Sequence, residues 1–235
     1  KPLDIIRVNN YDKLVMFDSL GLVYTLKISD VRGVDLSSIG LPINSFVRAF
    51  TSNTKIVNSF VMKEDGSLAY DYFKSPDESY FIFSTKMGLI KKTAYKEYTD
   101  LKQSVVAINL NTGDEVVSVQ YANKDRNVLV YTYAGYGSLF NTDSITETKR
   151  MSKGVRSLEL IPNDGVKNTA IIGNNDSHVV LFTERGYCKR MGLDLVPKQD
   201  RRSDGYTLIN LDDGDLLTYV DSTSDNNTFR VYMSD

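Results

Sequence analysis

Apolar residues in this chain gather in short runs, and polar residues gather between them. Runs of β-branched and aromatic residues at Tyr80–Phe83, Val128–Tyr131 and Val179–Phe182 have the length and composition of buried strands. Loops rich in Asp, Asn, Ser and Gly, such as Gly173–Ser177, separate these runs and indicate turns. No helix-period segment exceeds about two turns, and the best candidate is Tyr95–Leu101. The pattern predicts an all-β protein.

One sequence motif recurs along the chain. It consists of a strand-like run, a threonine, two residues and a glycine, followed in its clearest copies by two apolar residues and a basic pair. Asp18 takes the place of the threonine in the first copy. The intervals between Gly88, Gly135 and Gly186 are 47 and 51 residues, and a period of this size indicates one supersecondary unit copied around an axis or along a stack. The copies lie at residues 15–21, 83–92, 130–135 and 182–190.

Each copy is expected to form a β-hairpin, because the glycine supplies the positive φ that a tight reversal needs. The interval from Gly21 to Gly88 is 67 residues, and we attribute its excess of about 18 residues over one period to an inserted loop around Thr51–Ser75. Units of about 50 residues, mostly strand, fit a propeller-like disc of about five four-stranded blades.

A chain of 235 residues could form one large β domain or two ordinary ones, and the unbroken repeat favours a single domain over residues 1–235. The hydrophobic fraction of 41% supports a packed core, and no apolar run approaches the ~18 residues of a membrane span. The chain begins in mid-repeat, so we expect a piece of a longer protein. Both ends lie in partial repeats, and Phe229–Met233 is expected to pair with Ile5–Val8 or Leu14–Phe17 and remove two open edges. One cysteine in 235 residues excludes a disulfide framework and favours a reducing compartment.

The net charge of −2 argues against nucleic acid, but the cations are unevenly distributed. They concentrate in three segments of the sequence, which we call windows and which recur at about the interval of the repeat. A bladed disc would bring these windows to one rim. A curved row of cations suits the phosphates of a bent duplex. The alternative is that these side chains lie on exposed strand edges and prevent aggregation. The windows are Lys86, Lys91, Lys92 and Lys96; Lys149, Arg150, Lys153 and Arg156; and Arg185, Lys189, Arg190, Lys198, Arg201 and Arg202.

Three segments carry a family resemblance. Thr85–Thr93, Lys153–Leu158 and Gly186–Met191 resemble the C-terminal domain of the A subunits of bacterial type IIA topoisomerases, and the resemblance covers essentially the whole chain. It is closer to the topoisomerase IV members than to the gyrase members. Gyrase carries a basic box, roughly Gln-Arg-Arg-Gly-Gly-Lys-Gly, that locks the disc and drives chiral wrapping. The nearest segment here, Gln199–Gly205, has two acids and lacks the second glycine and the lysine, which argues against strong wrapping.

The resemblance implies a β-pinwheel whose positive outer rim binds and bends DNA without sequence preference and presents segments to a catalytic core for relaxation or decatenation. It implies three partners, namely double-stranded DNA, the rest of the A subunit, and the ATPase B subunit. It also implies no cofactor in this domain and a bacterial cytoplasmic location. The isolated domain is expected to be monomeric. It is not expected to be an enzyme by itself, because the family's DNA-cleaving tyrosine belongs to another domain.

The expected DNA-binding residues are the cations of the three windows, and the two pairs that follow a motif glycine are expected to contribute most. Those pairs are Lys91 with Lys92 and Lys189 with Arg190, which should project from equivalent outer strands. The full set is Lys86, Lys91, Lys92, Lys149, Arg150, Lys153, Arg156, Arg185, Lys189, Arg190, Lys198, Arg201 and Arg202.

Other candidate chemistry is scarce. His178 has no partner at metal-ligand spacing and is expected in an exposed loop, and Cys188 is expected to be a small core or edge residue. Asp212–Asp215 lacks the spacing of a calcium loop and is expected to be a solvated turn. Two further function classes remain open. They are a protein-interaction scaffold, with the basic windows on different faces, and a small hydrolytic propeller, with carboxylates converging in a pocket.

Overall fold

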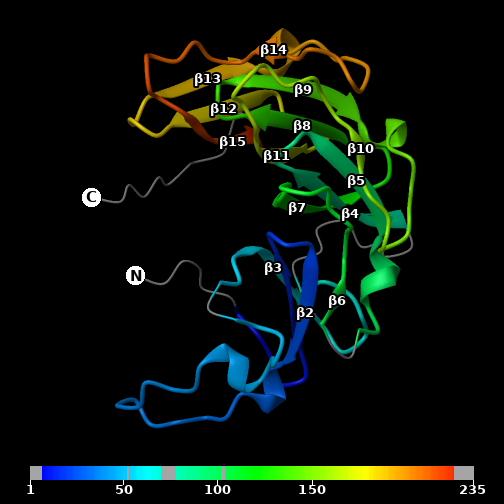
Figure 1. Ribbon diagram of the computed structural model, residues 1–235, viewed down its shortest axis with the longest axis vertical. Helices are drawn as coiled ribbons and strands as arrows, with labels where there is room; N and C mark the ends of the chain where they lie inside the picture. Colours follow the sequence, from blue (N-terminus) through cyan, green and yellow to red (C-terminus); the bar gives the residue numbers. More distant parts are fainter. Residues whose placement is uncertain (1–6, 52, 70–77, 102–103, 225–235) are drawn as a thin grey trace.

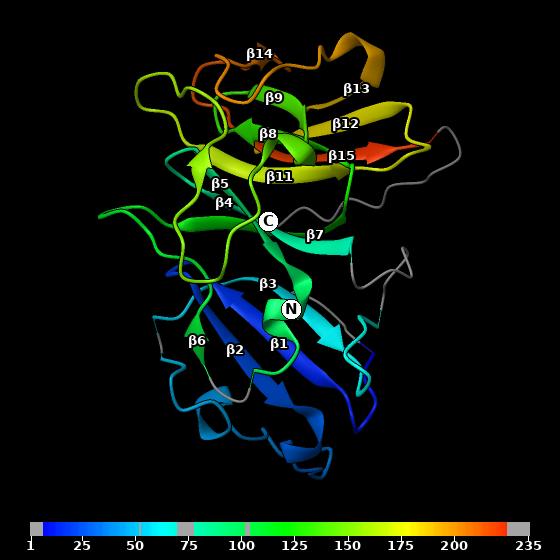
Figure 2. The same cartoon turned by 90° about the vertical axis from the view of Figure 1, so that its right-hand side faces the viewer.

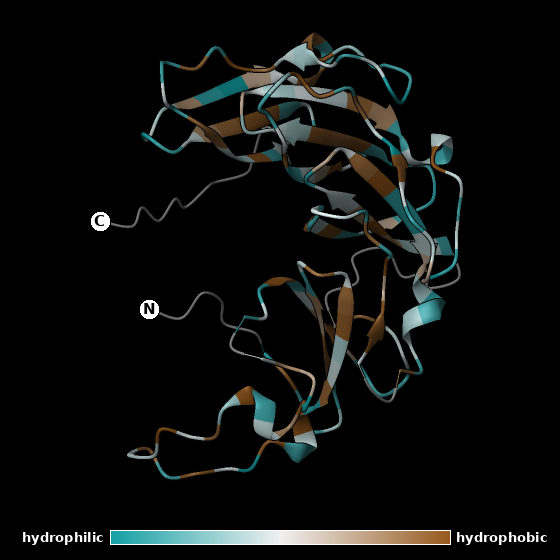
Figure 3. Ribbon diagram, in the orientation of Figure 1, coloured by the Kyte–Doolittle hydropathy of each residue, from teal (hydrophilic) through white to brown (hydrophobic). Residues whose placement is uncertain are grey.

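The computed structural model describes residues 7–51, 53–69, 78–101 and 104–224. In this part of the chain, four antiparallel sheets follow one another along an open arc (Figure 1). Seen from the side, the first sheet lies at one end of the molecule and the fourth near the other (Figure 2). Hydrophobic residues concentrate on the strands and hydrophilic residues in many of the connecting loops (Figure 3). The all-β, bladed architecture expected from the sequence is therefore present.

Each sheet is one blade, named here by its order along the chain. Blade 1 has the strand order β3 (Ile56–Met62), β1 (Lys13–Asp18), β2 (Leu22–Lys27), β6 (Val105–Val106). Blade 2 has the order β10 (Val155–Arg156), β5 (Leu89–Ala94), β4 (Ser79–Thr85), β7 (Val116–Asn123). Blade 3 has the order β11 (Val166–Ile172), β8 (Asn127–Thr132), β9 (Tyr136–Asn141), β14 (Tyr206–Thr207). Blade 4 has the order β13 (Cys188–Gly192), β12 (His178–Thr183), β15 (Leu217–Thr223).

Short 3-10 helices follow the second strand of each hairpin. They are η1 (Ile28–Asp30), η4 (Tyr95–Tyr98), η5 (Thr142–Ser144) and η6 (Leu193–Leu195), and η2 (Ile43–Ser45) lies further along the first unit. The helical turn expected at Tyr95–Leu101 is thus a single 3-10 turn.

The outermost strand of a blade comes from the next unit along the chain. After its own hairpin, a unit sends a segment back to the preceding blade, where two residues pair with the outer hairpin strand. In this way β6 pairs with β2, β10 with β5 and β14 with β9. We call these segments arms: arm 2 is residues 95–108, arm 3 is 142–158 and arm 4 is 193–209. Neighbouring blades also pack through their inner strands β3, β7, β11 and β15.

The repeated motif builds the hairpin turn. The motif glycines have positive φ, for example +85° at Gly88 and +86° at Gly135. The threonine hydroxyl accepts a hydrogen bond from the amide after the glycine, as in Leu89 N to Thr85 Oγ1 at 3.2 Å. In the first unit the Asp18 carboxylate accepts the equivalent bond, which explains why aspartate can replace threonine there.

A second repeated residue holds the same turn from outside the hairpin. Asp114 Oδ1 accepts hydrogen bonds from Met87 N and Glu115 N, both at 2.9 Å. Asp164 and Asp215 make the equivalent bonds to the turns of the next two hairpins. Asp215 is only 5% exposed, so the expectation that Asp212–Asp215 is simply a solvated turn is wrong for its last residue.

The core lies within and between the sheets. Phe17 of blade 1 contacts Phe81 and Phe83 of blade 2, with ring centroids 5.0 and 5.4 Å apart. Blades 2 and 3 share a cluster around Ile82, Ile90 and other residues, and blades 3 and 4 share one around Leu129 and Leu181. These shared clusters join the sheets into a continuous arc.

Three sequence expectations need correction or lie outside the described residues. The described residues form four blades rather than about five, and the fourth has three strands. The expected inserted loop contains β3, the inner strand of blade 1. Phe229–Met233 lies outside the described residues, but Leu14–Phe17 cannot receive it, because β1 already pairs with β2 and β3 on its two edges. Of the other candidate, Ile5–Val8, the first two residues also lie outside.

Gly135→Ala should destabilise the fold more than Gly88→Ala. Both glycines have positive φ, which costs a side chain roughly 1–2 kcal/mol. A Cβ on Gly135 would lie 2.6 Å from the Ile209 carbonyl oxygen of arm 4, whereas one on Gly88 would lie 3.4 Å from its nearest neighbour. We therefore expect urea unfolding to show that Gly135→Ala lowers the free energy of unfolding by about 1 kcal/mol or more beyond the loss caused by Gly88→Ala. Equal losses would show that arm docking tolerates the methyl group.

Candidate nucleic-acid interface

The arms form the outer edge of the molecule, and arms 3 and 4 carry two clusters of cations. Arm 3 runs beside β5, where Thr148 N donates to Lys92 O at 2.9 Å, and arm 4 runs beside β9, where Gln199 N donates to Leu139 O at 2.8 Å. The two arms also meet each other, since Arg202 N donates to Ser157 O at 2.8 Å. Backbone bonds therefore fix the positions of both clusters on adjacent blades.

Five of the cations on arms 3 and 4 are exposed. Lys153 Nζ donates to Asn111 Oδ1 at 2.8 Å, and Arg156 forms an ion pair with Glu159 at 2.6 Å. The exposed cations of arms 3 and 4 are Lys149, Lys153, Arg156, Lys198 and Arg202.

Two more arm cations are half-buried and bind the protein itself. Arg201 donates from Nη1 to Arg156 O at 2.7 Å and from Nε to Ser144 O at 3.2 Å, so it ties arm 4 to arm 3. Burial, and then the neighbouring charge of Arg202, lower the pKa of Arg201. Arg150 lies 3.9 Å from Glu97 of arm 2.

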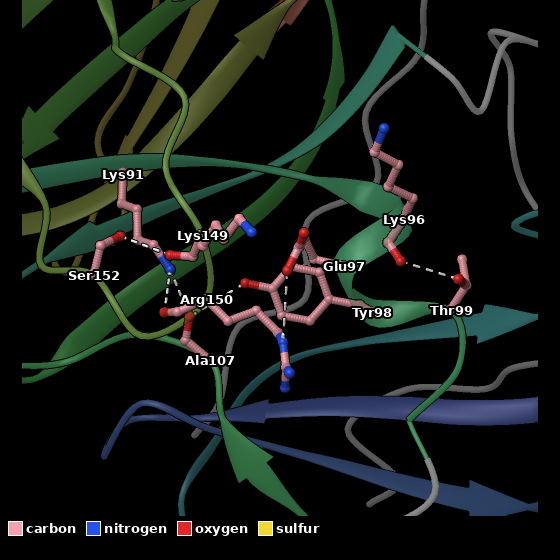
Figure 4. A network of polar contacts seen from close by, with 9 residues as sticks. All are labelled: Lys91, Lys96, Glu97, Tyr98, Thr99, Ala107, Lys149, Arg150 and Ser152. Carbon is pink, nitrogen blue, oxygen red and sulfur yellow. Dashed lines mark hydrogen bonds and ion pairs between the residues drawn. The ribbon is translucent and has the colours of Figure 1, made fainter.

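The basic pair on β5 does not lie at the surface. Lys91 is 1% exposed, and its ammonium group donates to Ala107 O of arm 2 and Arg150 O of arm 3, both at 2.6 Å. Figure 4 shows Lys91 between these two carbonyls, with Tyr98 donating to the same Ala107 oxygen. Burial, with a smaller effect of the Arg150 charge, lowers the pKa of Lys91 to about 7. Lys91 thus joins two successive arms to blade 2.

Lys92 is also buried, at 7% exposure, and donates to Thr142 O at 2.8 Å. Burial lowers its pKa. The expectation that Lys91 and Lys92 project outward is therefore wrong, because arm 3 covers β5. The amino groups of both residues donate to backbone carbonyls inside the protein.

The equivalent pair on β13 is exposed. Lys189 Nζ donates to Leu208 O of arm 4 at 2.8 Å, which repeats the Lys91 contact with arm 2. Arg190 lies 3.2 Å from His178 Nδ1. His178 itself begins β12 and is half-buried, so it does not belong to an exposed loop as expected. Cys188 is an exposed residue on the edge strand β13.

The remaining cations of the expected set lie in the hairpin turns. Lys86 is paired with Glu115 at 3.0 Å, and the hydrogen bond to this carboxylate raises its pKa. Arg185 is exposed in the turn between β12 and β13. The expected set therefore divides into five exposed arm cations, two half-buried arm cations, two turn cations, two cations on β13 and two buried lysines.

No cluster of three metal-ligating side chains occurs in the described part of the chain. A cavity of about 340 Å³ between the inner strands contains Asp176 and Asp221. Asp176 accepts from Gly173 N at 2.7 Å and Asp221 accepts from the Tyr219 hydroxyl at 2.9 Å, so both carboxylates have partners in the protein. This arrangement gives no support to a hydrolytic site. Within the described ranges, no helix is long and apolar enough to cross a membrane.

Comparison with known proteins is consistent with this architecture. The family model described as "DNA gyrase C-terminal domain, beta-propeller" matches residues 79–123, 127–172 and 177–224. The chain is 28% identical over 204 residues to the A subunit of DNA topoisomerase 4 from Bacillus subtilis, covering 86% of the chain and 24% of that protein. It is 27% identical over 199 residues to the A subunit of DNA gyrase from Salmonella typhimurium, covering 84% and 21%. The chain thus spans about a quarter of these relatives or less.

Solved structures show the same fold. The C-terminal domain of DNA topoisomerase IV matches with a TM-score of 0.77 and 21% identity, covering 93% of this chain and 65% of that one. The C-terminal domain of Escherichia coli ParC matches with a TM-score of 0.59 and 15% identity, covering 91% and 80%. The resemblance inferred from the motifs is therefore confirmed.

Proposed function

Because this chain belongs to the family of DNA gyrase C-terminal domains, we propose that it binds and bends double-stranded DNA along its outer edge without sequence preference. In the whole enzyme it would present DNA segments to a catalytic core for relaxation or decatenation. Its protein partners, in the bacterial cytoplasm, would be the rest of the A subunit together with the ATPase B subunit. Residues 1–235 would act as one binding domain, with the catalytic residues elsewhere.

The observation that carries this proposal is the placement of exposed cations on arms 3 and 4. Lys149 and Lys153 of one arm and Lys198 of the next are held on adjacent blades by backbone bonds. Lysine and arginine contacts to phosphates position a duplex but carry no sequence information. The described residues contain no helix of a length that could enter a DNA groove. Non-specific binding follows from these features.

Energetics favour a short bend over a full wrap. Bending a site of 20–30 base pairs by 40–90° costs about 1–6 kcal/mol, which a few phosphate contacts can offset. The overall charge of −2 provides little long-range attraction. The segment Gln199–Gly205 also lacks the lysine and the second glycine of a gyrase-type basic box, and its Arg201 is bound to two carbonyls of the protein.

Titration of fluorescent duplexes at several salt concentrations tests the proposal. If the five exposed arm cations each contact one phosphate, the logarithm of the affinity should fall against the logarithm of salt with a slope of about −4.5. Duplexes of unrelated sequence should bind equally. Absence of binding at low salt would favour the interaction-scaffold alternative, and a strong sequence preference would contradict the phosphate-contact model.

A further inference from the structure

Arm 3 presents one exposed apolar side chain between two exposed cations. Met151 is 68% exposed, and Lys149 and Lys153, two residues away on either side, are also exposed. The residues between them are half-buried, so outward and inward side chains alternate along this segment. Exposed apolar residues are common on protein surfaces, but this one lies inside a cation cluster of the candidate interface. We call residues 149–153 the arm 3 tip.

Hydrogen bonds to the protein fix the backbone beneath Met151. Asn109, which follows arm 2, donates from Nδ2 to Met151 O and from its backbone N to Ser152 O, the second bond at 3.2 Å. Lys91 Nζ of β5 donates to Arg150 O at 2.6 Å (Figure 4). Three successive carbonyl groups of the arm 3 tip are thus held by donors of the protein. The methionine therefore projects from a fixed backbone.

Arm 4 has the opposite charges at the equivalent positions. When the arms are aligned on Gly154 and Gly205, arm 3 reads Lys-Arg-Met-Ser-Lys-Gly and arm 4 reads Asp-Arg-Arg-Ser-Asp-Gly. Both arms form a turn here and pair with their blade through the residue that follows the glycine. Met151 corresponds to the exposed Arg202, so the fold of an arm does not require an apolar residue at this place.

The spacing of Lys149 and Lys153 suits the minor groove of a DNA duplex. Their Cα atoms are four residues apart in the chain and therefore at most about 14 Å from each other. The minor groove of B-form DNA is about 6 Å wide, so two lysine side chains at this separation can contact phosphates on both sides of it. An apolar side chain between them would face the sugars that line the groove rather than the phosphates.

These sugars differ between DNA and RNA at one position. The 2′ carbon of deoxyribose carries only hydrogens, whereas ribose carries a 2′ hydroxyl group that is displayed in the minor groove of an RNA helix. Methionine offers that hydroxyl no donor and only a weak acceptor, and covering a hydroxyl without a hydrogen bond is unfavourable. Contact with Met151 therefore favours deoxyribose. An RNA helix also has a wider minor groove, which the two lysines of the arm 3 tip fit less well.

Building on the DNA binding proposed above, we propose that the arm 3 tip enters the minor groove of the duplex and that Met151 makes this site select DNA over RNA. The two lysines bind phosphates of opposite strands, and Met151 packs against the sugars between them. Because the backbone beneath it is fixed, the side chain has little freedom to move aside for a hydroxyl group. Met151 thus sets specificity for the sugar without reading the sequence of the bases.

Titration of DNA and RNA duplexes of the same sequence tests this assignment. The unmodified chain should bind the DNA duplex more tightly. Met151→Ser should lower the DNA affinity about tenfold, because it removes one apolar side chain from the contact, and should change the RNA affinity less than about twofold. The salt slope should stay the same, because no cation is removed. Met151→Leu, which keeps an apolar side chain of similar volume, should restore the preference for DNA.

Met87→Ser is the matched control. Met87 is 51% exposed in the hairpin turn of blade 2, outside the arms, so its replacement should leave both affinities unchanged. Equal losses of DNA and RNA affinity in Met151→Ser, or no loss of either, would overturn the role of Met151 while leaving DNA binding itself intact. Failure of the unmodified chain to bind either duplex would contradict the proposed function, and this inference with it.

Discussion

Lys91→Met is expected to lower the free energy of unfolding by about 1–3 kcal/mol at alkaline pH, the usual cost of leaving buried hydrogen-bonding groups unpaired. At this pH the Lys91 side chain is a neutral amine, whose two N–H groups can still donate to Ala107 O and Arg150 O, which belong to two different arms. Methionine fills a similar volume but leaves both carbonyls without this donor. The loss should appear in urea unfolding and in faster exchange of the amides of arms 2 and 3.

The size of this effect should depend on pH in a defined direction. The pKa of Lys91 is about 7 in the folded protein and about 10.4 in an unfolded chain. Between these values the unfolded state binds more protons, so the contribution of Lys91 to stability rises as pH rises. The stability difference between the wild type and Lys91→Met should therefore be larger near pH 10 than near pH 6.

Lys96→Met provides the control for this experiment. Lys96 is exposed on η4, five residues along the chain from Lys91, and Figure 4 draws both side chains. Its replacement should change stability little, because surface substitutions generally fall within about 0.5 kcal/mol. A difference between wild type and Lys91→Met that stays constant across the pH range would show that Lys91 is not held with a lowered pKa.

Replacing Lys149, Lys153 and Lys198 by glutamine should remove most of the DNA affinity. All three are exposed on arms 3 and 4. If each contacts one phosphate, the salt slope should decrease in magnitude by about 2.7. Fluorescence anisotropy at several salt concentrations measures both the affinity and the slope.

A second triple variant separates position from charge. Lys27, Lys63 and Lys124 are exposed but lie outside arms 2, 3 and 4, and their replacement by glutamine changes the net charge equally. This control should leave the slope nearly unchanged. If both triple variants reduced the slope by the same amount, the arms would have no special role in binding DNA.

The sequence predicts the hairpins well, because their determinants are local. Thr85 and Gly88 lie within one turn, and their spacing is visible in every later copy. Asp114, Asp164 and Asp215 recur at intervals of 50 and 51 residues, so their shared role at the turns could have been found from the same period. The signal was present but resembled ordinary loop composition.

The exposure of the basic pairs could not be predicted from the motif. Lys91 and Lys189 occupy the same position after the motif glycine and make the same contact with their own arm. Their surroundings differ because arm 3 covers β5, whereas no arm covers β13 among the described residues. Burial is therefore decided by a segment about 60 residues away in the chain, and no local pattern reports it.

The exchange of outer strands has a consequence for the order in which the chain folds during synthesis. Blade 1 pairs β2, which ends at Lys27, with β6, which begins at Val105. It cannot be completed until the whole hairpin of blade 2 has left the ribosome. The same delay applies at each later blade, so every nascent intermediate ends in a sheet with an unpaired edge. Such edges favour aggregation, and synthesis of the next repeat removes each one in turn.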